Sequence, residues 1–251
     1  MRPTTPAEQE KNEPNDLALA DYIRKVFKES PPQVEQIFHG SISPKLKRDR
    51  KNRILIYGGC FNPPHVGHLE QLIHCFRAGQ AHFNVIAAVI CIIKARKIKK
   101  KDLQSPSEVL SEGVRAKLWN QDPRFPEWAW ILPEHWIGIY PFTDRLREAS
   151  KTDGFDIDFM SVQGSDHYRD GTIHGFPSWG CFEFITSDMS RYNYYIQRNA
   201  LHRLKDFEEW EALSVEEDRK EIPLETISDV DVKAAGSQDD ILWYLGTPFV
   251  H

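Results

Sequence analysis

The sequence contains no long hydrophobic run and few cysteines. No apolar stretch approaches the roughly 20 residues that a helix needs to cross a bilayer. Residues 1–16, MRPTTPAEQEKNEPND, are too polar for a secretory signal. The cysteines form no C-x-x-C pair and lie in or beside apolar runs, which is typical of reduced, buried thiols: Cys60, Cys75, Cys91 and Cys181. We therefore expect a cytoplasmic or nuclear protein with no disulfide framework and no membrane partner.

The sequence also lacks an excess of positive charge. Its formal net charge is -5 at pH 7, which gives no overall attraction to nucleic acid or to an anionic membrane. We therefore expect no nucleic-acid partner, and we interpret function from local motifs that would bind small molecules. The composition leaves the oligomeric state open.

The chain is predicted to consist of a tail, an extension and one main domain. Residues 1–16 have almost no apolar side chains to offset the entropy of ordering, so a disordered tail is expected. Residues 17–52 hold an amphipathic pattern that ends at a Pro-Pro pair, followed by a basic connector, and a helix from this extension should dock on the main body. Residues 53–251 form the main domain, whose acidic stretch at 206–221 is expected to be a solvated helix face.

Strands and helices alternate through the main domain. Apolar, β-prone runs predict strands at 53–57, 84–93, 128–132, 155–162 and 181–186. Helical spacing predicts helices over 69–79, 107–119 and 144–149. Alternating strands and helices favour stacked βαβ units with right-handed crossovers. The predicted fold class is therefore α/β, with a doubly wound, mostly parallel sheet and a helical N-terminal extension.

One stretch between the first strand and the first helix has an unusual composition: GGCFNPPHVGH, residues 58–68. In an open α/β sheet, ligands bind beyond the carboxyl ends of the strands, where loops lead into helices. Gly58 and Gly59 would let the backbone approach a ligand closely. Asn62 is expected to cap the helix, and the Pro-Pro pair after it suits the first helical turn. The stretch therefore predicts a ligand-binding turn at a helix start.

Two histidines lie where this helix begins. A helix N-terminus carries free N–H groups and partial positive charge, which attract phosphate. His65 and His68 would share one face of the first turn and point at the anion; alternatively, they are ordinary histidines at a helix start. The G-x-G-x-x-G fingerprint and the G-x-x-x-x-G-K-[ST] loop are both absent. The turn therefore indicates a different way of binding phosphate, suited to phosphoryl or nucleotidyl transfer.

The stretch GGCFNPPHVGH resembles the G-x-F-N-P-P-H-x-G-H signature of the nucleotidylyltransferase superfamily, in particular its nicotinamide or nicotinate mononucleotide adenylyltransferase branch. The resemblance covers about residues 53–200. It implies a Rossmann-like fold and the transfer of AMP from ATP to a phosphate-bearing acceptor, with Mg²⁺ assisting and pyrophosphate leaving. No general base is implied, because an acceptor phosphate is already an anionic nucleophile. The acceptor and the choice between ATP and CTP stay open.

The resemblance also assigns roles within the stretch. His65 and His68 would contact the triphosphate, and His68 would stabilise the α-phosphate in the transition state. Backbone groups of Gly59, Cys60 and Phe61 would lie against the nucleotide.

Two later stretches resemble further elements of the family. KIKKKDL, residues 97–103, resembles its K-K-x-L segment, so Lys100 or Lys101 would neutralise phosphates; the alternative is a solvated basic loop or a nuclear-import patch. QGSDH resembles its G-x-D element, in which Gly164 admits close approach and Asp166 would bond polar groups of ribose or adenine. The alternative for Asp166 is a helix cap.

ITSDMSR, residues 185–191, resembles the family's I-S-S-T-x-I-R motif. Ser187 matches it, and Arg191 would hold the triphosphate because its planar guanidinium suits phosphate oxygens; alternatively, Arg191 is a surface residue. Asp188 and Ser190 depart from the motif, and a carboxylate near a triphosphate is unfavourable unless a metal or the arginine compensates. The interval before this motif is also shorter than in the mononucleotide branch. These departures favour one alternative, a catalytically impaired member that binds a nucleotide or a partner protein.

Two other classes of site compete for the same region. Metal-ligand residue types crowd into a short segment, namely Cys60, His65, His68, His74 and Cys75, but no C-x-x-C or H-E-x-x-H spacing marks a zinc site. A hydrolase nucleophile, Cys60 or Ser165, would lack a G-x-S-x-G elbow. We therefore expect a nucleotidyltransferase without a resident metal site.

Overall fold

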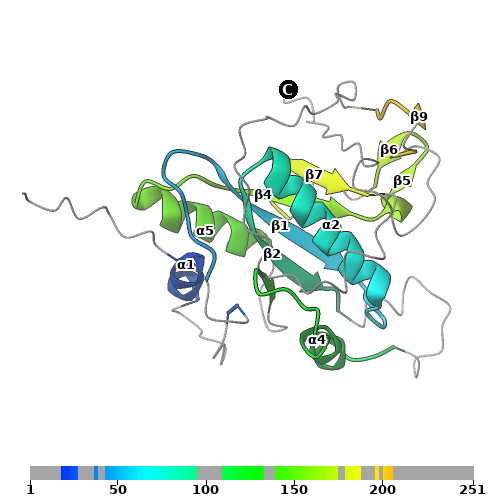
Figure 1. Cartoon of the computed structure of the whole chain (residues 1–251), viewed down its shortest axis with the longest axis horizontal. Helices are drawn as coiled ribbons and strands as arrows, with labels where there is room; N and C mark the ends of the chain where they lie inside the picture. Colours follow the sequence, from blue (N-terminus) through cyan, green and yellow to red (C-terminus); the bar gives the residue numbers. More distant parts are fainter. Residues whose placement is uncertain are drawn as a thin grey trace, which may run out of the picture.

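The computed structural model of the protein describes residues 18–27, 37–38, 43–94, 109–132, 139–174, 179–187, 196–197 and 200–205. The predicted tail and the acidic stretch lie outside these residues. Within them, a parallel sheet lies between two layers of helices (Figure 1). No helix in these ranges has both the length and the hydropathy that a membrane span requires.

Five strands form the central sheet in the order β3-β2-β1-β4-β7, and every neighbouring pair is parallel. Their bounds are Asn52–Gly59 for β1, Val85–Ile92 for β2, Ala129–Ile131 for β3, Ile157–Gln163 for β4 and Glu183–Thr186 for β7. Each predicted strand is present, with ends that differ by a few residues. The order confirms the predicted Rossmann-like, doubly wound α/β fold.

The order in which strands are added to the sheet reverses between β1 and β4. From β1 the chain proceeds to β2 and β3 on one side, and it then crosses back to β4 and β7 on the other. Tyr57 lies opposite Val162, so the carboxyl ends of β1 and β4 are adjacent. Such a switch point is where ligands bind in α/β sheets. The loop after β1 therefore starts at the position predicted for a ligand.

Helices α2 (Val66–His82) and α4 (Glu112–Asn120) pack on one face of the sheet. α2 extends further than its apolar spacing predicts. α4 starts later than predicted, because the hydroxyl of Ser111 accepts a hydrogen bond from the N–H of Val114 and so caps the helix there. Leu72 of α2 and Trp119 of α4 are both buried against the strands.

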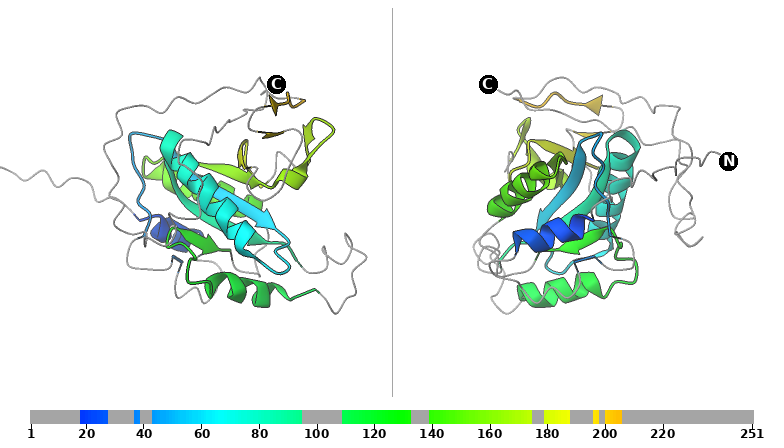
Figure 2. Two further views of the ribbon diagram at one scale, coloured as in Figure 1. Left: turned by 45° about the vertical axis from the view of Figure 1, so that its right-hand side comes forward. Right: turned by 90° about the vertical axis from the view of Figure 1, so that its left-hand side faces the viewer.

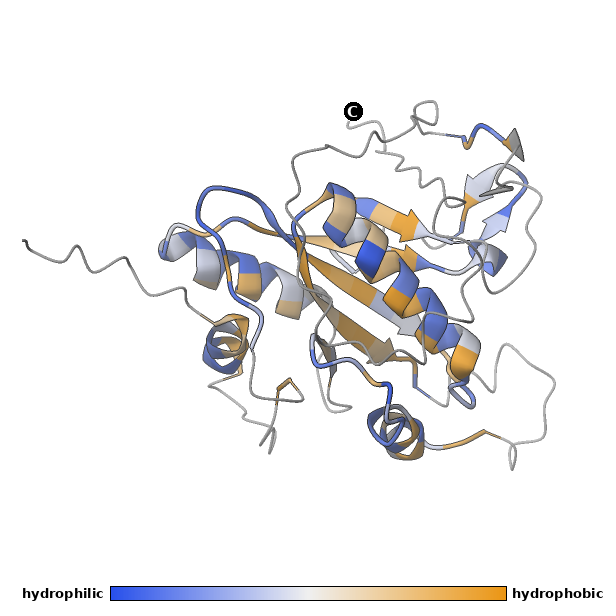
Figure 3. Cartoon of the chain, viewed as in Figure 1, coloured by the Kyte–Doolittle hydropathy of each residue, from blue (hydrophilic) through white to orange (hydrophobic). Residues whose placement is uncertain are grey.

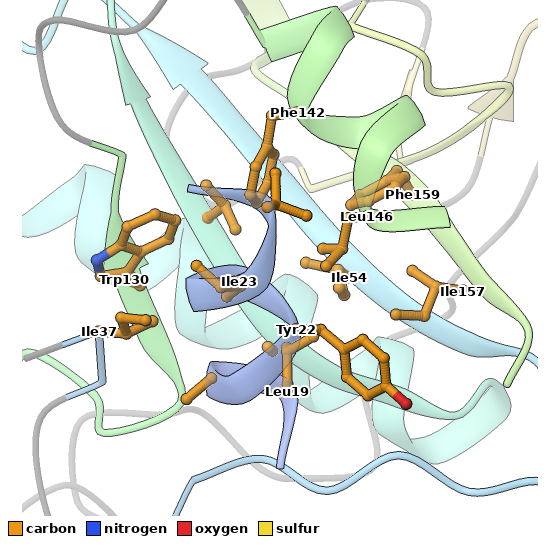
Figure 4. Packing of buried hydrophobic residues seen from close by; sticks show 14 of the residues in the cluster. Leu19, Tyr22, Ile23, Ile37, Ile54, Trp130, Phe142, Leu146, Ile157 and Phe159 are labelled. Atoms are coloured by element: carbon orange, nitrogen blue, oxygen red, sulfur yellow. The ribbon is translucent and has the colours of Figure 1, made fainter. Parts of the chain in front are cut away.

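Helices α5 (Ile139–Thr152) and α1 (Leu19–Val26) cover the opposite face (Figure 2). Figure 4 shows Leu19, Tyr22 and Ile23 of α1 between Trp130 of β3 and Ile157 of β4. All three α1 side chains are buried. The helix of the N-terminal extension therefore supplies part of the same core as the sheet.

Polar and aromatic contacts fix the orientation of α1. The hydroxyl of Tyr22 donates a hydrogen bond to Asp153 just after α5 (2.8 Å). The ring of Phe27 meets Trp130 in a T-shaped contact with centroids 5.8 Å apart. Figure 3 shows that the strands at the centre are apolar, whereas polar residues lie on the outer surfaces of the helices.

Short elements follow β4 and β7. A 3₁₀ turn (Ser165–His167) leads into a hairpin of β5 (Tyr168–Arg169) and β6 (Thr172–Ile173). A second hairpin pairs β8 (Ile196–Gln197) with β9 (Ala200–Leu201). Tyr168 and Ile173 pack with Phe184 of β7 and Leu204 in a small apolar cluster. These elements therefore rest on the β7 side of the sheet.

Removing one side chain of α1 should destabilise the whole domain. Ile23 is 0% exposed, so Ile23→Ala should lower the free energy of unfolding by about 2–4 kcal/mol, since it leaves a cavity. The exposed Arg24 on the same helix is the matched control, and Arg24→Ala should change stability by under about 0.5 kcal/mol. Urea unfolding of both variants measures this. Equal stabilities would show that α1 does not belong to the core.

His74 on α2 should make stability depend on pH. Burial, with a smaller effect of Arg77, lowers the pKa of His74 to about 4 from 6.5. The unfolded chain therefore takes up a proton first as pH falls. The free energy of unfolding should be retained above about pH 6.5 and should fall between about pH 6.5 and 4, by about 1–2 kcal/mol given the partial exposure of the ring. In urea unfolding from pH 7 to 4, His74→Gln should lose this decrease; a variant that keeps it would contradict the assignment.

Candidate functional site

The loop after β1 leads directly into α2, which begins at Val66. His65 is the N-cap residue, with an extended backbone. The prediction that Asn62 caps this helix, with the Pro-Pro pair in its first turn, is therefore wrong. Oδ1 of Asn62 instead accepts a hydrogen bond from the backbone N–H of Leu110 (2.9 Å). This bond connects the Asn62 side chain to the segment before α4.

The two histidines stack on each other at the N-terminus of α2. Their ring centroids are 3.6 Å apart, with 30° between the planes. The N–H of His65 donates to Nδ1 of His68 (3.2 Å), and the His65 side chain accepts from the N–H of His68, so the pair forms a reciprocal capping box. Because Nδ1 of His68 accepts, the proton of the neutral ring lies on Nε2, a donor suited to a phosphate oxygen. The structure therefore brings the two predicted residues together.

Phe61 supports the ring of His68 from the core. The Phe61 backbone has φ 44, and its buried ring makes T-shaped contacts with His68 (5.1 Å between centroids) and Trp119 (5.3 Å). The ring of Tyr57 in β1 also makes a T-shaped contact with the Phe61 ring, with centroids 5.0 Å apart. A Cβ on Gly59 would lie 2.7 Å from the Phe61 ring, so this position requires glycine. The position of His68 is therefore fixed by aromatic packing in the core.

Gly58 has a different role from the one predicted. A Cβ on Gly58 would lie 1.5 Å from the indole of Trp179, which packs with the α1 and α5 side of the core. Trp179 has φ 59, and the following Gly180 carbonyl accepts a hydrogen bond from Arg147 of α5. Gly58 therefore admits an indole of this chain at a position where the sequence predicts the close approach of a ligand. No local pattern marked Trp179 in the sequence.

A buried polar network joins the strand ends beneath the loop. The Tyr57 hydroxyl donates to Oε1 of Gln71 on α2 (3.0 Å), and Nε2 of Gln71 donates to the carbonyl of Gln163 (3.1 Å). The hydroxyl of Thr186 donates to the same carbonyl (2.9 Å). Burial raises the pKa of Tyr57, so its hydroxyl stays protonated. The network fixes α2 relative to β1, β4 and β7.

Gly164 and Asp166 lie at the carboxyl end of β4, beside β1. Gly164 is the N-cap position of the 3₁₀ turn, and Asp166 lies within the turn, so the alternative in which Asp166 caps a helix is wrong. A Cβ on Gly164 would lie 2.6 Å from Oδ1 of Asp166, so the carboxylate folds over this glycine. Asp166 is exposed. Both predicted residues therefore lie at the switch point.

The remaining predicted contacts lie at or beyond the end of β7. Ser187 directly follows this strand and is buried. Arg191 and the departure Asp188 lie outside the described residues, as do Lys100 and Lys101. Their positions relative to the histidine pair stay predictions.

The cysteines and Ser165 are the residues on which the alternative metal and hydrolase sites would depend. All four cysteines are free thiols. In the described part of the chain, no three His, Cys, Asp or Glu side chains are grouped to hold a metal ion. Burial raises the pKa of the Cys75 thiol, and it raises that of Cys91 to about 12, so both stay protonated. Ser165 is also buried, which makes it a poor nucleophile for an external substrate.

Arg115 of α4 contacts the site and was not among the residues predicted from the sequence. The side chain is 0% exposed, and its guanidinium donates to the carbonyls of Leu110 (3.1 Å), Ile93 (2.8 Å) and Cys60. Arg115 therefore links the loop after β1 to the end of β2. Its position four residues before Trp119 on the predicted helix was the available signal, since both then share one helix face.

The contact between Gly58 and Trp179 can be tested by a double-mutant cycle. Gly58→Ala should lower the free energy of unfolding by about 1–3 kcal/mol, because the new methyl group overlaps the indole. In a Trp179→Ala background the same change should cost far less, and the coupling free energy should exceed about 0.5 kcal/mol. Urea unfolding of the four proteins measures the coupling. Additive effects would show that the indole does not lie on Gly58.

The segment that holds this site is similar to a known protein family. Residues 56–166 match a family model described as Cytidylyltransferase-like. The match covers less than half of the chain, but it includes the loop, the histidine pair and Asp166. It confirms the predicted likeness to the nucleotidylyltransferase superfamily and indicates a nucleotidyltransferase. A comparison with curated protein sequences found no match.

The solved structures that are similar to this chain include one entitled "Plasmodium falciparum nicotinic acid mononucleotide adenylyltransferase complexed with APC". The two chains are 14% identical, with a TM-score of 0.30. The alignment covers 45% of this chain and 51% of that chain, so this chain spans about half the length of the protein it matches. A likeness of this size carries no argument about the substrate.

Proposed function

We propose that the protein is a nucleotidylyltransferase that transfers AMP from ATP to a phosphate-bearing mononucleotide, such as nicotinamide or nicotinate mononucleotide. Pyrophosphate leaves, and the reaction would be a step of NAD biosynthesis. The observation that carries the proposal is the stacked pair of His65 and His68 at the N-terminus of α2. The pair lies at the switch point of the sheet, where small-molecule ligands bind in this fold class.

The geometry of the pair suits nucleotidyl transfer. An oxygen of the acceptor phosphate attacks the α-phosphorus of ATP, and the bond between that phosphorus and the oxygen bridging to the β-phosphate breaks. Negative charge on the α-phosphate oxygens is stabilised by the dipole of α2 and by the Nε2–H of His68. His65 is the more exposed of the two residues and contacts the neighbouring phosphates. No general base is required, because the acceptor phosphate is already ionised.

Other predicted residues complete the proposed nucleotide site. Asp166 is exposed at the end of β4, where its carboxylate accepts hydrogen bonds from ribose hydroxyls or from the adenine amino group. Arg191 binds the triphosphate, and Lys100 or Lys101 adds positive charge. The support for these three basic residues is their place in the family motifs.

Magnesium belongs to the substrate in this proposal. The described residues contain no cluster of three metal-ligating side chains. Mg²⁺ keeps several waters and commonly binds through substrate phosphates and one or two carboxylates, so it fits a site in which it arrives with ATP. Bound there, Mg²⁺ would neutralise charge on the triphosphate.

A second candidate function is nucleotide binding without turnover. Asp188 favours it, since a carboxylate within the last family motif would repel a triphosphate unless it is compensated. The two functions differ in one product, because only the transferase releases pyrophosphate.

Pyrophosphate release distinguishes these functions and tests His68. Purified protein with ATP, Mg²⁺ and nicotinamide or nicotinate mononucleotide should release pyrophosphate. His68→Ala should lower kcat by roughly 10²-fold or more, because it removes a donor to the developing charge. The matched control is His82→Ala at the opposite end of the same helix, which should leave kcat unchanged.

The assay also includes other phosphorylated acceptors and CTP. Binding of ATP without pyrophosphate from any acceptor would support the non-catalytic function. An unchanged kcat in His68→Ala would remove this residue from the mechanism.

A further inference from the structure

We propose that Arg115 is a positioning residue that holds the loop carrying His65 and His68 in the conformation that binds a triphosphate. The inference rests on the proposed function for its ligand. Arg115 lies on α4, far along the chain from the histidines, and it does not contact a substrate in this proposal. It acts through the backbone of the loop.

The first observation is how the guanidinium is used. Nε donates to the carbonyl of Leu110, Nη2 to that of Ile93, and Nη1 to that of Cys60. Arginine presents its N–H donors in a rigid planar fork, so one group bonds carbonyls from three segments of chain. Lysine places its donors on a single nitrogen and does not match this geometry. The side chain is fully buried, which makes the loss of these bonds costly.

The second observation is a separate tie between the same two segments. Asn62 accepts a hydrogen bond from the backbone N–H of Leu110 (2.9 Å). The residues on both sides of Phe61 are therefore anchored to the segment from Leu110 to Arg115. The backbone of Cys60 is held by the guanidinium, and the side chain of Asn62 is held by the main chain.

These ties determine where the histidine rings lie. Phe61 has a positive φ of 44, which is unfavourable for a bulky residue and persists only where the surroundings fix it. Its ring in turn supports His68, and His68 stacks on His65. The path from Arg115 to the triphosphate site is therefore a continuous series of described contacts.

A partly buried arginine elsewhere in the sheet provides the matched control. Arg53 lies at the amino end of β1 and forms a bidentate ion pair with Glu183 (2.6 and 3.0 Å). Arg53 therefore lies at the opposite end of β1 from the loop that carries the histidines. Arg53→Lys should lower stability without altering the histidine pair, whereas Arg115→Lys should alter both.

The first measurement is backbone amide exchange without nucleotide, so it does not depend on the proposed function. In Arg115→Lys, the amides of residues 60–68 should exchange about tenfold or more faster than in the wild type, after correction for any change in global stability. In Arg53→Lys they should not. Unchanged exchange of this segment in Arg115→Lys would overturn the proposal.

The second measurement is kcat, determined with whichever acceptor gives pyrophosphate release in the wild type. A misplaced donor impairs alignment in the transition state. Arg115→Lys should therefore lower kcat by about tenfold or more, with a smaller change in KM for ATP. Arg53→Lys should keep the wild-type kcat. Faster loop exchange with an unchanged kcat would show that Arg115 is merely structural, and would also overturn the proposal.

Two further outcomes separate this inference from the proposed function. If the wild type binds ATP but transfers nothing, the proposed function fails, and faster exchange of residues 60–68 together with a loss of ATP affinity of about twofold or more in Arg115→Lys, absent in Arg53→Lys, would still support the positioning role. If the wild type does not bind ATP, both fail. Should Arg115→Lys not fold, Asn62→Ala removes only the second tie, and it should give the same signature with a smaller magnitude.

Discussion

The stack of His65 on His68 at the N-terminus of α2 is the interaction on which the proposed function of this protein depends. Each histidine bonds the backbone of the other, so the pair both caps the helix and faces the region where its dipole is positive. The cap directs the proton of the neutral His68 ring to Nε2. In the proposed function the same two side chains cap the helix and bind phosphate, so disturbing one role should disturb the other.

The core contributes by making this turn rigid. Phe61 connects the histidine pair to Tyr57 and Trp119, and the polar network through Gln71 fixes α2 against the strand ends. On the opposite face, α1 and α5 bury the other side of the strands. Catalysis of phosphoryl and nucleotidyl transfer is mainly alignment and charge stabilisation, so a protein of this kind needs a rigid loop more than it needs reactive side chains.

Structural features that depend on local sequence patterns could be predicted from the sequence, whereas contacts between distant segments could not. The continuous apolar runs of β1 and β2 predicted buried parallel strands because both faces of each strand are covered, and the amphipathic pattern of α1 predicted docking. The prediction that Asn62 caps α2 was wrong, because the side chain of Asn62 accepts a hydrogen bond from Leu110, a residue distant in sequence. Arg115 and Trp179 were missed for the same reason, since their roles arise only where loops from separate strands meet. The motif marked the histidines but carried no information on how Phe61 would support them.

The most direct test of the central claim is to observe the imidazoles while ATP binds. Side-chain ¹H–¹⁵N correlation spectra of the protein with labelled histidines should show saturable shifts of His65 and His68 when ATP and Mg²⁺ are added, with the His68 proton on Nε2 in the free protein. The signals of His74 and His82, further along α2, should move little. ATP binding that leaves the signals of His65 and His68 unchanged would contradict the claim that this pair binds the triphosphate.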